Sequence, residues 1–224
     1  MRIVGNPQLN NENVRRLIQN NVHVSEETLR VDKEYLSEIL NRDKVVLDIG
    51  SSLRSNSEFV SGSVKKLDTL DINEFENYPD IQMDLCEKML LPPDLKYDVI
   101  FCFSILEHCY DPFTASQNLF GMLKKNSLIV GSAPFLFPYH CPTDLEYQDF
   151  FRFTKHSYAV LFPNATRIEL TPMRGRVGAG LNIISQKYKD IIEAKFPKVV
   201  AWINSLDLKR KPEQTSGFHF EIYN

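Results

Sequence analysis

Short apolar runs, separated by stretches with helical spacing, recur along the chain from residue 44 onward. Residues 45–49 form one such run and residues 97–103 form another, and short continuous runs of this kind are typical of strands buried on both faces. Strands that alternate with helices indicate a parallel sheet with helices on both faces. The sequence therefore predicts an α/β domain with seven strands, at residues 45–49, 64–72, 81–83, 97–103, 127–133, 166–170 and 217–223.

The first 43 residues differ from this pattern because they are polar and helical in spacing. Residues 11–19 carry apolar side chains on one helical face, and Ser25 is placed to cap a second helix. We therefore expect residues 1–43 to form an N-terminal helical segment that packs on the core or covers the active site. Residues 44–224 then form the main domain, with a further long helical stretch at residues 187–206.

The overall composition narrows the class of protein. The chain has 224 residues, a formal net charge of -3 and a pI near 6.0, whereas a protein that grips nucleic-acid phosphates is usually basic. No apolar run reaches the roughly 18 residues needed to span a bilayer, and the N-terminus lacks the apolar core of a signal peptide. We therefore expect one globular domain with no transmembrane segment and no long nucleic-acid partner.

The 4 cysteines show neither a CxxC pair nor the spacing of a zinc site. This predicts free thiols in a reducing compartment, and we expect a cytoplasmic protein. No spacing along the chain requires a metal, so none is expected, although an acceptor diol would allow Mg²⁺ at Asp144 or Asp149.

Three acidic residues lie at or just after the carboxyl ends of successive predicted strands. Asp48 precedes a turn at Gly50, and residues 55–58 then have the spacing of a capping box at a helix start. Such a turn lets the backbone approach a ligand and directs free N–H groups at an anion. Asp71, at the end of the next strand, is placed to accept hydrogen bonds from ribose hydroxyls, and Asp84, after the third strand, from an adenine amino group. Each acid alone is typical of a solvated loop, but their shared register favours a nucleoside-containing ligand.

Residues 44–165 resemble the broad type-11 group of methyltransferases that depend on S-adenosylmethionine (SAM). The resemblance implies a Rossmann-like class I methyltransferase fold with an antiparallel last strand, and SAM as the cofactor. The short connection between the second and third acids is similar to variants associated with sugar and glycan methylation, which implies a sugar or glycan hydroxyl as the acceptor. The matching segments are residues 47–50, 70–72, 83–85, 97–100 and, most specifically, 104–112 followed by 123–125.

The resemblance also implies a set of cofactor contacts. The stretch from Asp48 to Ser52 matches the methionine end of SAM, and Asp71 and Asp84 match the ribose and adenine acids. Ser52 and Arg54 stand where this group usually carries further glycines, so either they donate to the SAM carboxylate or they narrow the pocket and weaken binding. The expected cofactor-binding residues are Asp48, Gly50, Ser51, Ser52, Asp71, Ile72, Asp84, Leu85, Ser104 and His108.

The acceptor side is expected in the loop after the fifth predicted strand, near the edge where open α/β sheets bind ligands. His140 is the candidate general base because imidazole ordinarily titrates near neutrality, and His108 is its rival. Asp149 and Arg152 are expected to orient acceptor hydroxyls, but Arg152 is equally placed to tie the loop to Asp144. The catalytic residues are therefore predicted to be His140, Asp149 and Arg152.

Three functions remain open on the sequence alone. The first is O-methylation of a sugar or glycan hydroxyl. The second is methylation of a lipid, quinone or other small metabolite, which the aromatic residues of this region would also suit. The third is a catalytically silent methyltransferase-like module that binds other proteins, which the residues Ser52 and Arg54 keep open. The acceptor and the oligomeric state are left open.

Overall fold

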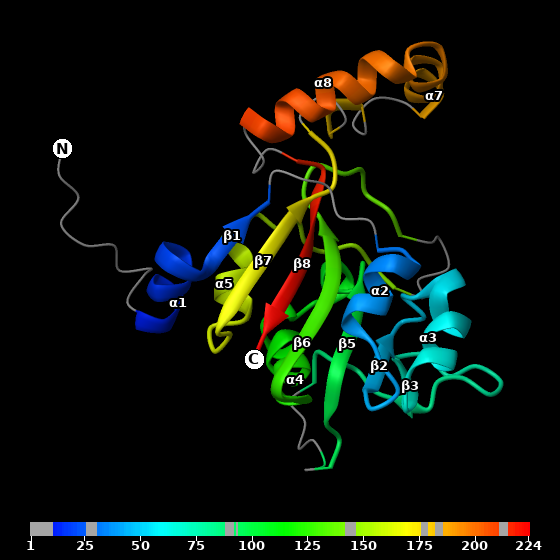
Figure 1. Cartoon of the computed structure of the whole chain (residues 1–224), viewed down its shortest axis with the longest axis vertical. Coiled ribbons are helices and arrows are strands. Elements are labelled where there is room, and N and C mark those ends of the chain that lie inside the picture. Colours follow the sequence, from blue (N-terminus) through cyan, green and yellow to red (C-terminus); the bar gives the residue numbers. More distant parts are fainter. Residues whose placement is uncertain are drawn as a thin grey trace.

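The sheet of eight strands organises the chain (Figure 1). The computed structural model describes residues 11–25, 31–87, 92, 94–141, 147–175, 179–181, 186–210 and 215–224. The strands are β1 (Val22–Val24), β2 (Val45–Ile49), β3 (Lys66–Asp71), β4 (Ile81–Gln82), β5 (Tyr97–Phe103), β6 (Leu123–Pro134), β7 (Arg167–Pro172) and β8 (Gly217–Tyr223). The longer helices are α1 (Glu12–Arg16), α2 (Lys33–Ile39), α3 (Ser57–Ser63), α4 (Pro112–Gly121), α5 (Ser157–Leu161), α7 (Gln186–Lys195) and α8 (Pro197–Arg210).

The strands lie in the order β1-β7-β8-β6-β5-β2-β3-β4. Every neighbouring pair is parallel except those made by β8, which runs antiparallel to both β6 and β7. The mostly parallel sheet and its antiparallel last strand are therefore confirmed. The eighth strand, β1, lies within the segment expected to be helical. Its Val-His-Val sequence favours an extended backbone, and it pairs with residues 168–170 of β7.

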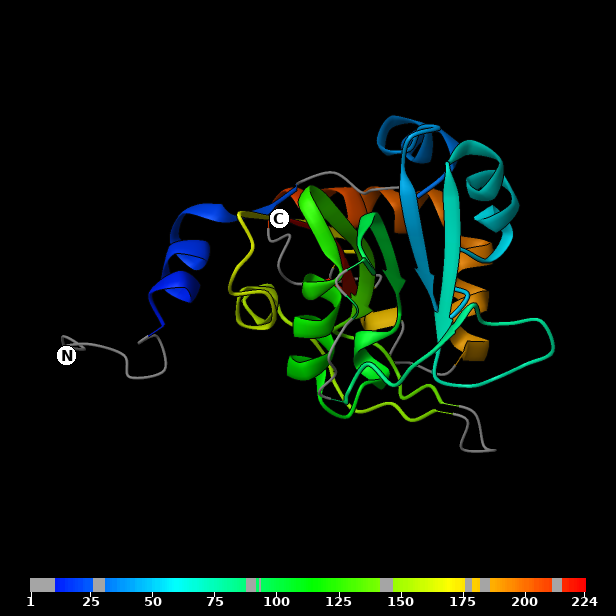
Figure 2. The same ribbon diagram turned by 90° about the horizontal axis from the view of Figure 1, so that it is seen from below.

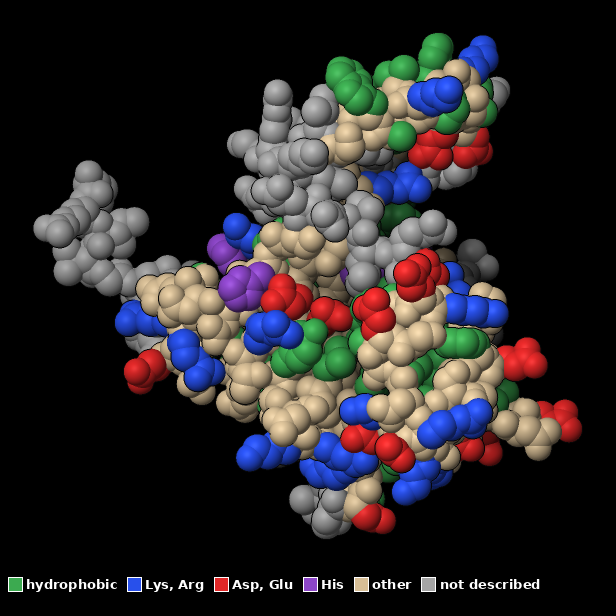
Figure 3. Space-filling view, in the orientation of Figure 1, with side chains coloured by type: hydrophobic (Ala, Val, Ile, Leu, Met, Phe, Trp, Pro, Cys, Tyr) green, Lys and Arg blue, Asp and Glu red, His purple; other side chains and the backbone are tan. Residues whose placement is uncertain are grey.

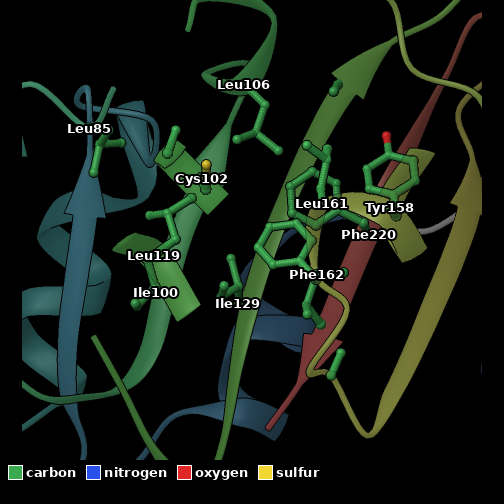
Figure 4. Close-up of a cluster of buried hydrophobic side chains, with 14 of the residues drawn as sticks. Leu85, Ile100, Cys102, Leu106, Leu119, Ile129, Tyr158, Leu161, Phe162 and Phe220 are labelled. Atoms are coloured by element: carbon green, nitrogen blue, oxygen red, sulfur yellow. The ribbon is translucent and has the colours of Figure 1, made fainter. Parts of the chain in front are cut away.

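Two separate hydrophobic clusters cover the two faces of the sheet. In β5, Ile100 and Cys102 join the cluster that contains α1, α4 and α5, whereas Val99 and Phe101 join the cluster that contains α2 and α3. Successive residues of a strand point to opposite faces, so one apolar run supplies both clusters. Figure 2 shows this layering, and Figure 4 shows part of the first cluster, including Leu119, Ile129, Tyr158, Leu161, Phe162 and Phe220.

Gly131 in β6 permits the closest packing in this first cluster. A Cβ atom added there would lie 2.2 Å from the carbonyl oxygen of Cys102 and 2.4 Å from Cζ of Phe220. Real Cβ atoms do not approach other atoms so closely, so the Phe220 ring occupies the space that a larger residue at this position would need. Phe220 itself is 1% exposed and contacts the rings of Tyr158 and Phe162.

The carboxyl ends of the parallel strands share one edge of the sheet, and α7 and α8 lie above this edge (Figure 1). They are inserted between β7 and β8, and the Arg174 guanidinium, just after β7, contacts the Glu193 carboxylate of α7 at 2.9 Å. Figure 3 shows hydrophobic side chains on the outer surface of these helices. The exposed large ones are Tyr188, Ile191, Phe196, Val199 and Trp202. Among the described residues, no helix combines the length and the apolar character needed to cross a bilayer.

Helix α3 begins close to the predicted position but without the predicted cap. The chain enters it through a 3₁₀ turn, η3 (Arg54–Asn56), and the Asn56 side chain at the N-cap makes no capping hydrogen bond. The predicted helix at residues 187–206 is present as two helices, because α7 ends just before Pro197 and α8 begins there.

The packing around Phe220 predicts a stability effect. Replacing Phe220 by Ala leaves a cavity beneath β6 and should lower the free energy of unfolding by about 3–5 kcal/mol. Urea unfolding followed by circular dichroism measures this change. The matched control is Phe113→Ala on α4, where the side chain is 52% exposed and the change should be within roughly 0.5 kcal/mol. Equal losses in the two variants would contradict this account of the core.

Candidate active site

A cavity of about 860 Å³ opens at the carboxyl ends of the parallel strands. Asp48, Ser51, Asp149 and Arg152 are predicted site residues that do not line it, and they lie behind or beside residues that do. The predicted residues in its wall are Gly50, Ser52, Asp71, Ile72, Asp84, Leu85, Ser104, His108 and His140.

The turn after β2 is held by the buried carboxylate of Asp48. This carboxylate accepts hydrogen bonds from the Ser52 hydroxyl at 2.7 Å and from the Leu53 N–H at 3.1 Å. Burial raises the pKa of Asp48 to about 6. Gly50 has a φ of +64°, and a Cβ atom there would lie 2.6 Å from Cδ1 of Ile105. Asp48 thus positions a turn whose left-handed backbone at Gly50 favours glycine, and a Cβ atom there would require the Ile105 side chain to shift.

Asp71 ends β3 with its side chain in the cavity wall. One carboxylate oxygen accepts a hydrogen bond from the Asn73 N–H at 3.0 Å, and the other accepts one from the Tyr78 hydroxyl at 3.1 Å. An ionised carboxylate has about four acceptor positions, so these two bonds orient Asp71 and leave capacity for ligand hydroxyls. Burial is the main cause that raises the pKa of Tyr78.

The far end of the cavity combines one acid with apolar walls. One oxygen of Asp84 accepts a hydrogen bond from the Cys86 N–H at 2.8 Å. Leu85 is buried, and its carbonyl accepts a hydrogen bond from the Asn118 side chain at 2.9 Å. Ile72 and Phe75 are each about half exposed and line the same wall. This end of the cavity suits a flat, partly polar group.

The turn after β5 buries a carboxylate. Ser104 has a φ of +55°, an uncommon conformation for a residue with a side chain, and the turn continues into η4 (Leu106–His108). The Glu107 side chain is fully buried, and burial raises its pKa to about 8. The backbone carbonyl of Glu107 accepts hydrogen bonds from the N–H groups of Phe150 and Phe151, at 2.8 and 3.2 Å. These bonds fix the aromatic loop of residues 147–153 against the turn.

His140, Asp149 and Arg152 form a connected group beside this turn. The Nδ1 atom of His140 lies 3.1 Å from a carboxylate oxygen of Asp149, and the same oxygen accepts the His140 N–H at 2.8 Å. The Arg152 guanidinium binds both oxygens of Asp149 and holds the pKa of that carboxyl at about 2. Arg152 is therefore tied to Asp149. Asp144, the partner considered from the sequence, lies outside the described residues.

His108 and His140 face one another across the cavity wall. Their ring centroids are 5.1 Å apart in an edge-to-face arrangement, and Tyr147 packs against His108 at 4.5 Å. Nδ1 of His108 lies 2.6 Å from the carbonyl oxygen of Gln148. Burial is the main cause that lowers the pKa of His108. The neutral imidazole of His108 is thus favoured at this position.

Several residues in or next to the cavity wall could not be predicted from the sequence. Glu107 appeared only as part of a motif, and nothing in the spacing showed that its carboxylate would be fully buried. Tyr78 lies in the short connection between β3 and β4, which gave no pattern to interpret. Arg174 lies just after β7 and His219 lies in β8, and the strand order brings both to the cavity.

Neither a protein-family profile nor a curated protein sequence matches this chain. Solved structures do match. A SAM-dependent methyltransferase from Archaeoglobus fulgidus aligns over 86% of this chain and 90% of its own, with 16% identity and a TM-score of 0.52. A SAM-dependent methyltransferase from Mesorhizobium loti aligns over 85% and 96%, with 12% identity and a TM-score of 0.50.

A third match is longer than this chain. Phosphoethanolamine N-methyltransferase 2 from Haemonchus contortus aligns over 84% of this chain with 13% identity and a TM-score of 0.48, and this chain spans only 50% of its length. The first two matches each cover more than four-fifths of both chains, so the similarity extends over most of the sheet. The chain therefore has the Rossmann-like fold found in SAM-dependent methyltransferases.

Proposed function

We propose that this protein is a SAM-dependent methyltransferase that modifies a small acceptor. One observation carries the proposal: a single cavity joins the Gly50 turn and Asp71 at one end to His108, His140 and Glu107 at the other. The first group suits a nucleoside-containing cofactor, and the second suits an acceptor that must lose a proton. A cavity of about 860 Å³ falls within the roughly 300–1,000 Å³ typical of ligand pockets.

The residues at the first end fit SAM. The Gly50 turn offers a close backbone approach, and Asp71 keeps acceptor capacity for the two ribose hydroxyls. Asp84 and the apolar pair Ile72 and Phe75 suit the adenine ring. Arg54, which also lines the cavity, offers a guanidinium for the carboxylate of the methionine part. When bound, SAM supplies a methyl group attached to a positively charged sulfur. The sulfur is the leaving group and keeps the electron pair of the broken carbon–sulfur bond.

The residues at the second end suit an acceptor hydroxyl, and we propose a sugar or glycan. Phe137, Tyr147 and Phe150 line the cavity there and offer flat surfaces for a sugar ring. Nδ1 of His140 lies 3.1 Å from the Asp149 carboxylate and 3.3 Å from the carbonyl oxygen of Pro138. A proton on Nδ1 is directed at these two acceptors, which leaves Nε2 to take the hydroxyl proton. The negative charge of Asp149 then stabilises the imidazolium, and Arg152 holds Asp149 in place.

The cysteines support a reducing compartment as the site of action. All of them, Cys86, Cys102, Cys109 and Cys141, are free thiols, and the first three are buried. We therefore propose the cytoplasm as the location of the enzyme.

The ribose assignment gives a binding prediction. Replacing Asp71 by Ala removes hydrogen bonds to a charged acceptor, each worth about 1.5–3 kcal/mol, so the affinity for SAM should fall by roughly 10- to 100-fold. Isothermal titration calorimetry measures this affinity. The control is Asp43→Ala, an exposed acid before β2, at the opposite edge of the sheet. Unchanged affinity in the Asp71 variant would remove Asp71 from the cofactor site.

The role of His140 gives a rate prediction. His140→Gln should lower turnover by roughly 10²- to 10⁴-fold, because a positioned base is lost, while SAM affinity stays near that of the wild type. The assay follows methyl transfer from SAM to a panel of nucleotide sugars, glycans and small phenols. Transfer to the phenols alone would overturn the sugar assignment, and wild-type turnover in the variant would reject His140 as the residue that activates the acceptor.

A further inference from the structure

The Glu107, His108 and His140 side chains bring three metal-ligating atoms together in the cavity wall. The Oε1 atom of Glu107 lies 3.9 Å from Nε2 of His108 and 3.8 Å from Nε2 of His140. One ligand atom from each residue lies within 4.8 Å of the other two. Ligand atoms bound to one tetrahedral ion are separated by roughly 3.3 Å, since each lies about 2.0–2.1 Å from the metal. The ligand atoms would therefore have to approach one another by roughly 0.5–1.5 Å to bind one ion.

The Glu107 carboxylate lacks a hydrogen-bond partner in the described part of the chain. Its side chain is fully buried, and neither of its oxygens accepts a hydrogen bond with good geometry, although the Ser104 side chain is close enough to oppose the rise in its pKa. A buried carboxylate ordinarily pairs with a cation or accepts several hydrogen bonds. The nearby Arg152 guanidinium already donates hydrogen bonds to both carboxylate oxygens of Asp149. A cation between Glu107 and the two imidazoles would satisfy this carboxylate.

The remaining ring nitrogens are held as in metal sites. Nδ1 of His108 donates to the carbonyl oxygen of Gln148 at 2.6 Å, and Nδ1 of His140 lies 3.1 Å from the Asp149 carboxylate. A carbonyl oxygen only accepts hydrogen bonds, so Nδ1 of His108 carries the proton and Nε2 has the free lone pair. A histidine whose other nitrogen donates to a carbonyl or carboxylate is the usual arrangement around bound metals. Both Nε2 atoms are thus available as ligands.

From this geometry we infer that Glu107, His108 and His140 bind a divalent first-row transition-metal ion. Two imidazoles and one carboxylate are a ligand set typical of Zn²⁺ and Fe²⁺, whereas Mg²⁺ and Ca²⁺ prefer all-oxygen sites. All three residues line the cavity, so the positions that the protein does not fill face the space where the acceptor would lie. Three protein ligands with an open position are typical of a catalytic rather than a structural metal.

The role of the ion rests on the proposed function, whereas its binding does not. Near an acceptor hydroxyl, the ion would lower the pKa of that hydroxyl. His140 would then act as a ligand, and Asp149 would be the group that orients it. In the metal-bound enzyme the acceptor proton is therefore not transferred directly to His140. A metal at this site also differs from the sequence-based expectation that no metal is needed.

Metal titration of the full chain tests this site directly. Protein without an affinity tag is treated with a chelator, dialysed and titrated with Zn²⁺ and with Co²⁺, by calorimetry and by the visible absorption of Co²⁺. We expect one ion per chain. Glu107→Gln and His140→Gln should each weaken binding by more than about 100-fold, the upper end of effects seen when only a supporting residue is changed. His23→Gln, an exposed histidine of β1, should bind the ion like the wild type.

Two results would overturn the inference. One is the absence of stoichiometric binding by the wild type; the other is unchanged binding in both site variants, which indicates an adventitious ion and a protonated Glu107. Thermal melting checks that each variant is folded, and His140→Gln, in a partly exposed loop, serves if Glu107→Gln does not fold.

Methyl transfer that persists after chelation rejects the catalytic ion but leaves the proposed function intact. Metal binding without SAM binding rejects the proposed function and leaves the metal site intact.

Discussion

The parallel alignment of β2, β3 and β5 is the constraint on which the site depends. Parallel strands end at the same edge of a sheet, so the turns after these three strands meet although they are far apart in the sequence. The Gly50 turn, Asp71 and the Glu107 turn therefore share one cavity. The antiparallel strand β8 adds His219 to the same wall. Any loss of this register would separate the cofactor end of the cavity from its acceptor end.

The part of the cavity wall proposed to bind the acceptor has two carboxylates in opposite environments beside it. Asp149 is bound by the Arg152 guanidinium, which holds its pKa at about 2, whereas burial raises the pKa of Glu107 to about 8. Two acids whose pKa values are pushed apart in this way are typical of sites that move protons. Asp149 stays ionised and orients His140, while Glu107 is stabilised either by a proton or by a cation. The two imidazoles lie between these carboxylates.

Much of the fold was predictable from the sequence because the core strands are continuous apolar runs. Residues 97–103, a continuous apolar run, and residues 217–223, which alternate apolar and polar side chains, were predicted with the bounds that β5 and β8 have. Strand β1 was missed because three residues are too few for a periodic pattern, and its position depends on pairing with β7. The predicted cap at Ser55 does not form, because a 3₁₀ turn leads into α3 instead. A strand as short as β1 is therefore determined by its pairing with a neighbouring strand and not by its local sequence pattern.

The candidate site was predictable in part for a related reason. Asp71 and Asp84 follow strands, and the ends of parallel strands converge, so their place in the cavity wall followed from the pattern. The role of Asp48 as a brace for the turn, and the pairing of Arg152 with Asp149, depend on side-chain directions that spacing does not encode. The same holds for Glu107, whose burial results from the aromatic loop of residues 147–153 packing on the turn.

The most direct test of the central claim is a calorimetric titration of the wild-type chain with SAM. We expect saturable binding of one SAM molecule per chain, because one continuous cavity joins the Gly50 turn to Asp71 and Asp84. A Kd of 1 mM corresponds to a binding free energy of only about -4 kcal/mol. An absence of saturable binding at millimolar SAM would therefore contradict the proposed cofactor site. In that case the fold would serve a function other than methyl transfer.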